Sequence, residues 1–146
     1  MKLIVPRKEF AEMATRMEHA VDVKNVTLSS IKLETKKEGI KMSATNLLLT
    51  VQGVVFCPGT EEPGSWCVPG KTLIDVVRSF SGESLILESA TNTLKISSGG
   101  SRYSLPTFPV ENFPLCPGFN NVEFFKMSSE AFVKIFSRLC FAAGDN

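Results

Sequence analysis

The nine residues 64–72, GSWCVPGKT, come nearest to a motif that binds nucleotide phosphates. A phosphate-binding loop has the pattern G-x-x-x-x-G-K-[ST], in which backbone N–H groups surround the phosphates. Five residues separate Gly64 from Gly70 where the motif has four, and Pro69 has no N–H to donate. The stretch therefore predicts a turn from a strand into a helix. A nucleotide-binding enzyme is kept only as an alternative.

The other side chains that could support catalysis or hold a metal ion are four cysteines and one histidine. No two cysteines form a C-x-x-C pair, and a single histidine does not complete a zinc site. His19 lies at the end of an amphipathic segment, with no neighbouring side chain in the sequence to orient it as a base. We therefore expect no cofactor, no metal and no enzymatic activity.

The overall composition favours no charged partner. The formal net charge is +1, so any surface for DNA must come from a local arrangement of charges. The first residues, MKLIVPRKEF, contain no long apolar run, and LLLTVQGVVF is too short to cross a bilayer. We expect a cytoplasmic protein that does not contact a membrane.

Two stretches of the chain each occur twice. The segment VPRKEFAEMATRM, which begins at Val5, matches VPGKTLIDVVRSF, which begins at Val68. The distance along the sequence between these two segments is called the first offset. The segment IKLETKKEGIKMS, which begins at Ile31, matches LILESATNTLKIS, which begins at Leu85, and the distance between them is called the second offset. The first pair predicts a strand that ends at proline and then a helix with one apolar face, and the second predicts a β-hairpin. Because the first offset is longer by nine, the first copy has nine more residues between its helix and its hairpin.

A third copy of the helix is expected near the end of the sequence. There, Phe132, Ile135, Arg138 and Leu139 repeat Phe10, Met13, Arg16 and Met17 in the same order and spacing. Repeats of this kind are typical of units that bury their apolar faces against one another. We therefore expect a first domain in residues 1–119, including a proline-rich linker, LPTFPVENFPLCPGF. Residues 120–146 are expected to form the first strand and helix of a second, truncated domain.

The repeat predicts an α+β fold, with two helices packed on antiparallel sheet and an internal pseudo-two-fold relation between the halves. The expected strands are residues 2–5, 28–35, 39–44, 48–56, 65–68, 84–89, 93–98 and 102–106, and the expected helices are residues 7–20 and 71–80. The glycines of SSGGS are expected in a hairpin turn. The outer helix faces carry mixed charges, which is typical of a solvated surface.

The last predicted strand contains the residues best suited to a protein interface, in the segment GSRYSLP. Arginine and tyrosine are enriched at interface centres, and a final strand can present an unpaired edge. Tyr103 and Leu105 share one side of this strand, and Arg102 lies on the other. From the sequence, packing of Tyr103 and Leu105 into the domain's own core is an equally good interpretation.

Four segments in this order and spacing resemble the bacterial DNA polymerase III beta subunit, the sliding clamp: ATNLLLTV, VPGKTLIDVVRSF, SRYSLPTFPVENFP and VEFFKMSSEAFVKIFSRLCFAA. The resemblance implies a DNA-clamp-like domain in a subunit of three similar domains. Two such subunits, a homodimer, close a ring around duplex DNA, with helices lining the channel. The implied function is that of a processivity factor, which tethers the replicative polymerase and is not itself an enzyme.

The resemblance also implies roles for particular residues. Lys24 and Lys71 stand at basic positions that contact DNA without reading its sequence, and the helix faces with Lys8, Lys71 and Arg78 would look toward the phosphates. The strand with Arg102, Tyr103 and Leu105 would meet the third domain of the second clamp subunit. Gly100 and Asn46 depart from the family's usual residues.

The cleft that receives the polymerase and the clamp loader lies, in the family, between the second and third domains. That cleft is not expected within these 146 residues. A free-standing, truncated clamp module that acts in protein interaction is the second alternative.

Overall fold

A computed structural model describes residues 2–58, 63–115, 123 and 125–143 of the chain. The chain divides into two compact units, Met1–Cys116 and Pro117–Asn146, which are described separately. The predicted domain boundary between residues 119 and 120 falls within residues 116–122, outside the described residues. The two predicted domains therefore stay a prediction.

The first unit contains two successive runs of strand, helix and three strands, in the order that the sequence predicts. The first run is β1 (Lys2–Pro6), α1 (Arg7–Arg16), β2 (Ser30–Lys36), β3 (Gly39–Thr45) and β4 (Thr50–Phe56). The second run is β5 (Ser65–Pro69), α2 (Gly70–Ser79), β6 (Ser84–Ala90), β7 (Thr93–Ser98) and β8 (Ser101–Pro106). The predicted α+β class is confirmed, with the strands in two antiparallel sheets.

The two runs exchange their first strands. The sheets have the orders β1-β6-β7-β8 and β4-β3-β2-β5, so each hairpin pairs with the first strand of the other run. Leu3 faces Leu87 in one sheet, and Trp66 faces Leu33 in the other. By the first offset Leu3 and Trp66 are matched positions of the repeat, and by the second offset so are Leu33 and Leu87. The pseudo-two-fold relation therefore extends to the register of the strands.

Backbone hydrogen bonds at the helix starts obey the same relation. The Arg7 N–H donates to the Glu83 oxygen at 2.9 Å, and the Gly70 N–H donates to the Ser29 oxygen at 2.8 Å. Each bond ties the first residue of a helix to the segment just before the other run's hairpin. The nine extra residues of the first run lie in the loop between α1 and β2, as the unequal offsets predict.

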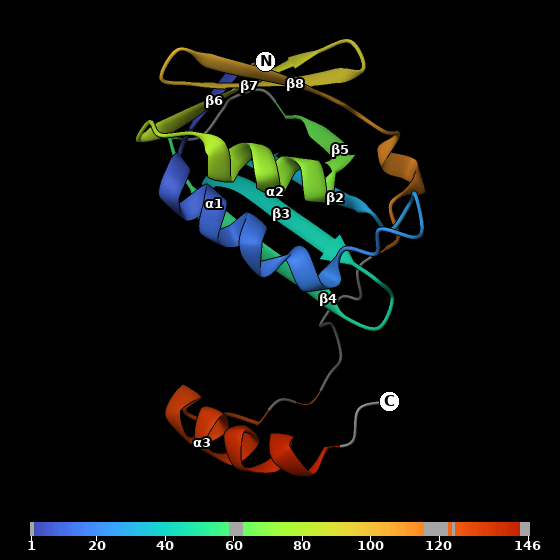
Figure 1. The fold of residues 1–146 in the computed structure, drawn as a ribbon, viewed down its shortest axis with the longest axis vertical. Helices are drawn as coiled ribbons and strands as arrows, with labels where there is room; N and C mark the ends of the chain where they lie inside the picture. Colours follow the sequence, from blue (N-terminus) through green and yellow to red (C-terminus); the bar gives the residue numbers. More distant parts are fainter. Residues whose placement is uncertain (1, 59–62, 116–122, 124, 144–146) are drawn as a thin grey trace. The chain divides into compact units, whose positions relative to one another are not determined.

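The helices α1 and α2 lie side by side in front of the strands (Figure 1). Their inner faces bury side chains at helical spacing, which form one core with the inward-facing residues of both sheets. From α1, η1 and α2 these are Phe10, Ala14, Met17, Ala20, Leu73, Ile74, Val76, Val77 and Phe80, all less than 9 % exposed. The opposite helix faces are exposed to solvent.

Three predicted element boundaries differ from the structure by two residues or more, and one of them is the start of the strand predicted from residue 28, which begins at Ser30. The helix predicted to residue 20 ends at Arg16 and is followed by a short 3-10 helix, η1 (Glu18–Ala20), which still buries Ala20. The strand predicted from residue 48 begins at Thr50, because the Asn46 side-chain oxygen accepts hydrogen bonds from Leu48 and Leu49 N–H and closes a turn. The SSGGS turn is confirmed, with φ angles of 55° at Gly99 and 88° at Gly100.

The first part of the proline-rich linker packs on the first unit. The Phe108 N–H donates to the Cys67 oxygen at 2.8 Å, which places the segment after β8 along β5. A short 3-10 helix, η2 (Val110–Asn112), follows, and Phe113 is only 8 % exposed. Residues 107–113 therefore add to the surface of this unit.

The second unit contains the helix that the third repeat predicts. Helix α3 (Ser129–Leu139) covers the four repeated positions, and the Ser128 hydroxyl caps it by accepting a hydrogen bond from Ala131 N–H at 3.2 Å. The strand expected before this helix, within residues 120–146, falls largely on residues that are not described, and residues 125–128 are not in a strand. Among the described residues, no helix is both long and apolar enough to cross a bilayer.

Candidate nucleic-acid interface and subunit edge

Lys71 and Lys24 belong to segments that are packed together at one end of α2. Lys71 is the second residue of α2, and its side chain is exposed. Gly70, just before it, packs so closely on the loop between η1 and β2 that a Cβ there would lie 2.9 Å from a Val21 methyl carbon and 3.0 Å from the Ser29 oxygen. Because Val21 and Ser29 belong to the loop that carries Lys24, the two cations lie at the same end of the domain.

The loop of residues 21–29 is held by its own hydrogen bonds. The Asp22 carboxylate accepts from the Lys24 N–H at 2.9 Å, and the Asn25 side-chain oxygen accepts from the Thr27 N–H at 3.0 Å. Leu28 is only 7 % exposed, so this part of the loop is buried. The backbone at Lys24 is therefore fixed, while its side chain is exposed to solvent.

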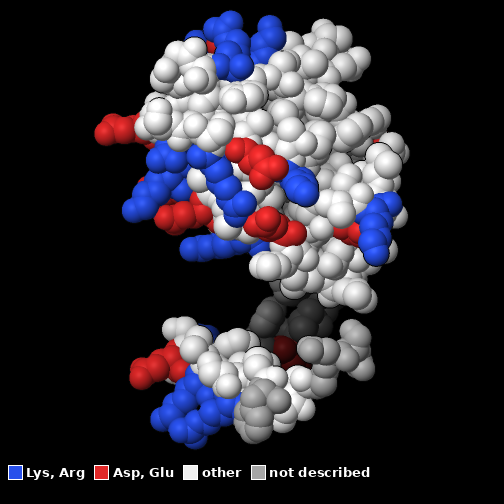
Figure 2. Space-filling view, viewed as in Figure 1, with Lys and Arg blue, Asp and Glu red and all other residues white. Residues whose placement is uncertain are grey.

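The exposed face of the helices carries both signs of charge, and Figure 2 shows basic and acidic side chains intermixed there. On α1, η1 and α2 the exposed cations are Lys8, Arg16, Lys71 and Arg78, and the exposed anions are Glu9, Glu12, Glu18 and Asp75. The Arg78 guanidinium forms an ion pair with the Glu18 carboxylate, with 2.8 Å between nitrogen and oxygen. The face as a whole is therefore close to neutral, and any attraction for phosphates must be local to residues such as Lys24 and Lys71.

The helix start at Gly70 is not arranged to bind phosphate. A phosphate loop uses the free N–H groups at the start of a helix, but the Gly70 N–H already donates to the Ser29 oxygen. The strand-to-helix turn that the sequence predicts is confirmed, since β5 ends at Pro69 and α2 begins at Gly70. In the described residues, no group of three or more His, Cys, Asp or Glu side chains is placed to hold a metal ion.

The strand β8 lies at an edge of its sheet, where it pairs only with β7. Leu105 is 3 % exposed and packs into the domain's own core, opposite Leu94 on β7. Tyr103 is 43 % exposed, and its ring meets the buried ring of Phe80 edge to face, with 5.5 Å between the ring centres. The structure therefore leaves Tyr103, Arg102 and the backbone edge accessible, while Leu105 supports the strand from beneath.

Arg102 belongs to a cluster of charges on the other face of this sheet. The Lys2 ammonium lies 3.1 Å from the Glu88 carboxylate. The hydrogen bond and the charge of Lys2, with smaller contributions from Arg102 and Lys95, hold the pKa of the Glu88 carboxyl below its usual value. Three cations and one anion thus share this face of the sheet, on strands from β1 to β8, so the face is locally positive.

The chain is similar in sequence to one family of known proteins. The profile of the family described as DNA polymerase III beta subunit, N-terminal domain, matches residues 1–117. This chain belongs to that family. A beta sliding clamp of Rickettsia bellii is 31 % identical to it over 138 residues, which cover 92 % of this chain and 36 % of the relative.

Solved structures of the beta-subunit family have the same fold. The DNA polymerase III subunit beta from Pseudomonas aeruginosa has a TM-score of 0.89 and 21 % identity, and the match covers all of this chain and 40 % of that one. The Helicobacter pylori beta clamp bound to a DNA ligase peptide has a TM-score of 0.76 and 24 % identity, over 82 % of this chain and 34 % of that one. The chain therefore spans between a third and two fifths of the length of these beta subunits.

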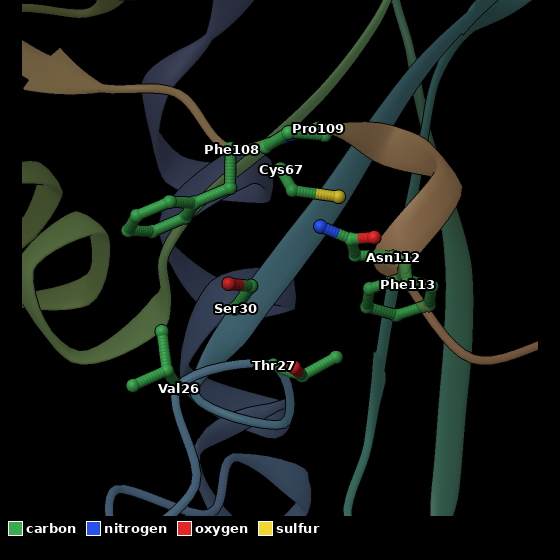
Figure 3. A pocket seen from close by; sticks show the side chains of 8 residues that line it. All are labelled: Val26, Thr27, Ser30, Cys67, Phe108, Pro109, Asn112 and Phe113. Carbon is green, nitrogen blue, oxygen red and sulfur yellow. The ribbon is translucent and has the colours of Figure 1, made fainter.

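The sequence analysis did not predict the hollows on the surface of this unit, and one of them lies close to Lys24. Ser30, Cys67 and Asn112 meet in a pocket beside the loop that carries Lys24 (Figure 3). These residues are far apart in the sequence and of ordinary types, so no motif could have indicated them. The nearest signal was the proline-rich segment after β8, whose folding back along β5 closes the pocket.

Proposed function

We propose that this chain forms the N-terminal part of a sliding clamp, a non-catalytic processivity factor that encircles duplex DNA and holds the replicative polymerase on it. The observation that carries this proposal is the family match over residues 1–117, together with the repeated strand and helix runs of the first unit. A ring built from such repeats needs similar domains with open sheet edges, and β8 is such an edge. A cytoplasmic location is part of the proposal.

The helix face is the side proposed to look toward DNA, with Lys24 and Lys71 as its phosphate contacts. Contacts of lysine with phosphates attract DNA without reading its sequence. A near-neutral face with only a few free cations would hold DNA weakly. A weak hold suits a clamp, because topological closure keeps the ring on DNA while the ring moves along it.

The edge of β8 is the proposed contact with the second clamp subunit. An exposed strand edge can extend a sheet across an interface through backbone hydrogen bonds. Tyr103 offers a partly exposed ring already fixed against Phe80, and Arg102 lies at the rim of the positive cluster. Leu105 would act indirectly, by holding the strand in place.

Protein partners are the last part of the proposal. The relative from Helicobacter pylori was crystallised with a DNA ligase peptide, which supports the view that clamps of this family take protein partners. For this protein we expect the replicative polymerase and the clamp loader. The two domains that the sequence predicts, residues 1–119 and 120–146, would be the first clamp domain and the start of the second.

A domain exchange tests the subunit edge. Residues 1–115 of this chain would replace the matching part of the Rickettsia bellii clamp, and the chimera's dimerisation would be measured by analytical ultracentrifugation. We expect a dimer that Tyr103→Asp weakens about 30-fold or more, because the variant places an unpaired charge at a packed contact. Thr72→Asp, at an exposed site on α2, is the matched control.

Two results would count against this assignment. If Tyr103→Asp dimerises as well as the parent chimera, the β8 edge is not the interface. If the parent chimera folds but stays monomeric, the alternative of a free-standing interaction module gains support over a ring subunit.

A further inference from the structure

The two runs of the first unit leave two matching strands at open sheet edges. β4 pairs only with β3, and β8 pairs only with β7. On β4, Gly53 faces Met42, and on β8, Tyr103 faces Ile96. Met42 and Ile96 are matched positions by the second offset, so β4 has a glycine where β8 has a tyrosine. The two edges therefore differ at a position that the repeat makes equivalent.

A hollow of about 330 Å³ lies between α1 and β4, and it is called the β4 hollow. Its apolar lining includes Met13, Val54 and Phe56. Since one water needs only about 10–15 Å³ of such space, the hollow has room for an aromatic side chain. The Met13 side chain lies over Gly53, where a Cβ would collide with it. At the equivalent position on β8, the partly exposed Tyr103 ring stands against Phe80. One edge thus has a hollow next to the position at which the other has an accessible aromatic ring.

The β4 edge is apolar as well as open. The exposed side chains of the strand are Gln52, Val54 and Phe56, none of them charged, and Phe56 is 69 % exposed. The turn that leads into the strand adds three exposed leucines, Leu47, Leu48 and Leu49. Edge strands of soluble proteins are usually protected by charges, prolines or a covering segment, since an uncovered edge pairs readily with another strand. An apolar edge without charges is therefore suited to contact with a protein.

Charge distinguishes the two edges and indicates which surface fits the β4 hollow. The charged residues that line this hollow are two anions and one cation, Glu9, Glu12 and Arg16. The β8 edge instead carries Arg102, on the sheet face that is locally positive. Two β8 edges would bring like charges and two aromatic rings together, and two β4 edges would leave both hollows empty. A β8 edge against a β4 edge brings opposite charges together and a ring into a hollow.

We propose that the β4 edge receives the β8 edge of a second copy of this chain, with Tyr103 of that copy in the β4 hollow. This inference rests on the proposed function, because it takes β8 as a contact edge. Backbone hydrogen bonds between the two strands extend one sheet into the next. The tyrosine ring packs against Met13 and Phe56. Its hydroxyl donates to the Glu9 or Glu12 carboxylate, since a buried tyrosine hydroxyl needs an acceptor. A pair of copies keeps one free edge of each kind, so association continues head-to-tail beyond a dimer.

Sedimentation velocity of the whole chain over a range of concentrations tests this contact. The mean mass should rise with concentration and pass that of a dimer. Phe56→Asp and Tyr103→Asp should each weaken the association about 30-fold or more, because each places an unpaired charge in the contact. Val23→Asp puts the same charge at an exposed apolar site on neither strand, and it should associate as the wild type does. Circular-dichroism spectra report whether each variant is folded.

Mixing the two variants separates this contact from a symmetric one. Phe56→Asp keeps a sound β8 edge and Tyr103→Asp keeps a sound β4 edge, so an equimolar mixture should form a dimer and nothing larger. Self-association of Phe56→Asp as strong as that of the wild type would overturn the proposal. A wild-type chain that stays monomeric at every concentration would also overturn it, as would a mixture that stays monomeric although the wild type associates. If the chimera with the Rickettsia bellii clamp dimerises through Tyr103 while this chain stays monomeric, the proposed function stands and only the β4 contact is wrong.

Discussion

The proposed phosphate contacts predict a measurable dependence of DNA binding on salt. Lys24 and Lys71 are exposed, and neither is in an ion pair among the described residues. Of the other exposed cations of the helix face, Arg78 is paired with Glu18, and Lys8 and Arg16 share α1 with the exposed carboxylates of Glu9 and Glu12. We therefore expect the chain to release counterions from about two phosphates.

The magnitude follows from these two contacts. Each phosphate neutralised on B-DNA contributes about −0.9 to the slope of log affinity against log salt, so the expected slope is about −1.8. Affinity should then fall about 12-fold between roughly 50 and 200 mM NaCl. Removing one lysine should reduce the fall to about 3.5-fold, and removing both should leave almost no salt dependence.

Fluorescence anisotropy with a labelled duplex, measured at several salt concentrations, gives these slopes directly. Lys24→Ala and Lys71→Ala are the test variants. Lys37→Ala is the matched control, because Lys37 is an exposed cation in the turn between β2 and β3, away from the helix face. A slope steeper than about −4, or a slope that changes with Lys37 but not with Lys24 or Lys71, would refute the assignment of these contacts.

Three further predictions concern stability and reactivity. Gly39→Ala should lower the free energy of unfolding in urea by about 2 kcal/mol or more, because Gly39 has a φ of 146° and a Cβ would collide with the Val55 oxygen. Gly100→Ala should lower this free energy less, because no atom of another segment lies within 4 Å of a Cβ at Gly100. Equal losses in the two variants would contradict the collision as the cause. Leu105→Asp should unfold the domain, because Leu105 is buried, while Tyr103→Asp should lower the melting temperature by only a few degrees, because the half-exposed Tyr103 loses its ring contact with Phe80. Similar circular-dichroism melts of the two variants would show this difference to be wrong. Burial raises the pKa of the Cys67 thiol from 9.0 to about 11. The protonated thiol should therefore stabilise the fold below pH 9, and this contribution should be lost between pH 9 and 11. The melting temperatures of the wild type and Cys67→Ala should accordingly converge over this pH range.

Much of the fold could be predicted because the sequence repeats itself. The two offsets relate matched positions in the helices and hairpins, and together they also relate the pairing of β1 with β6 to that of β5 with β2. The pattern could not tell whether each first strand pairs within its own half or with the other half, because both arrangements satisfy the same offsets. That choice depends on long-range packing, such as Leu3 against Leu87, which no local pattern encodes.

The candidate site was less predictable than the fold. The exposed lysines could be named only through the family resemblance, since lysine on a helix face is ordinary. Leu105 and Tyr103 are two residues apart and lie on the same side of the strand, so the sequence does not distinguish their roles. The structure does, because Leu105 is buried in the core and Tyr103 is half exposed. The Ser30 pocket depends on residues 107–113 folding back along β5, and the prolines that indicate a linker do not predict where it packs.

The claim that this chain supplies one sector of a closed ring is tested most directly on circular DNA. The chimera with the Rickettsia bellii clamp would be loaded onto a nicked circular plasmid and its retention followed by gel filtration, before and after a single cut that linearises the plasmid. We expect the chimera to stay with the circle and to leave once the DNA is linear, because only enclosure holds it. Equal retention on the two forms, or release from both by a chimera that is folded and dimeric, would contradict it.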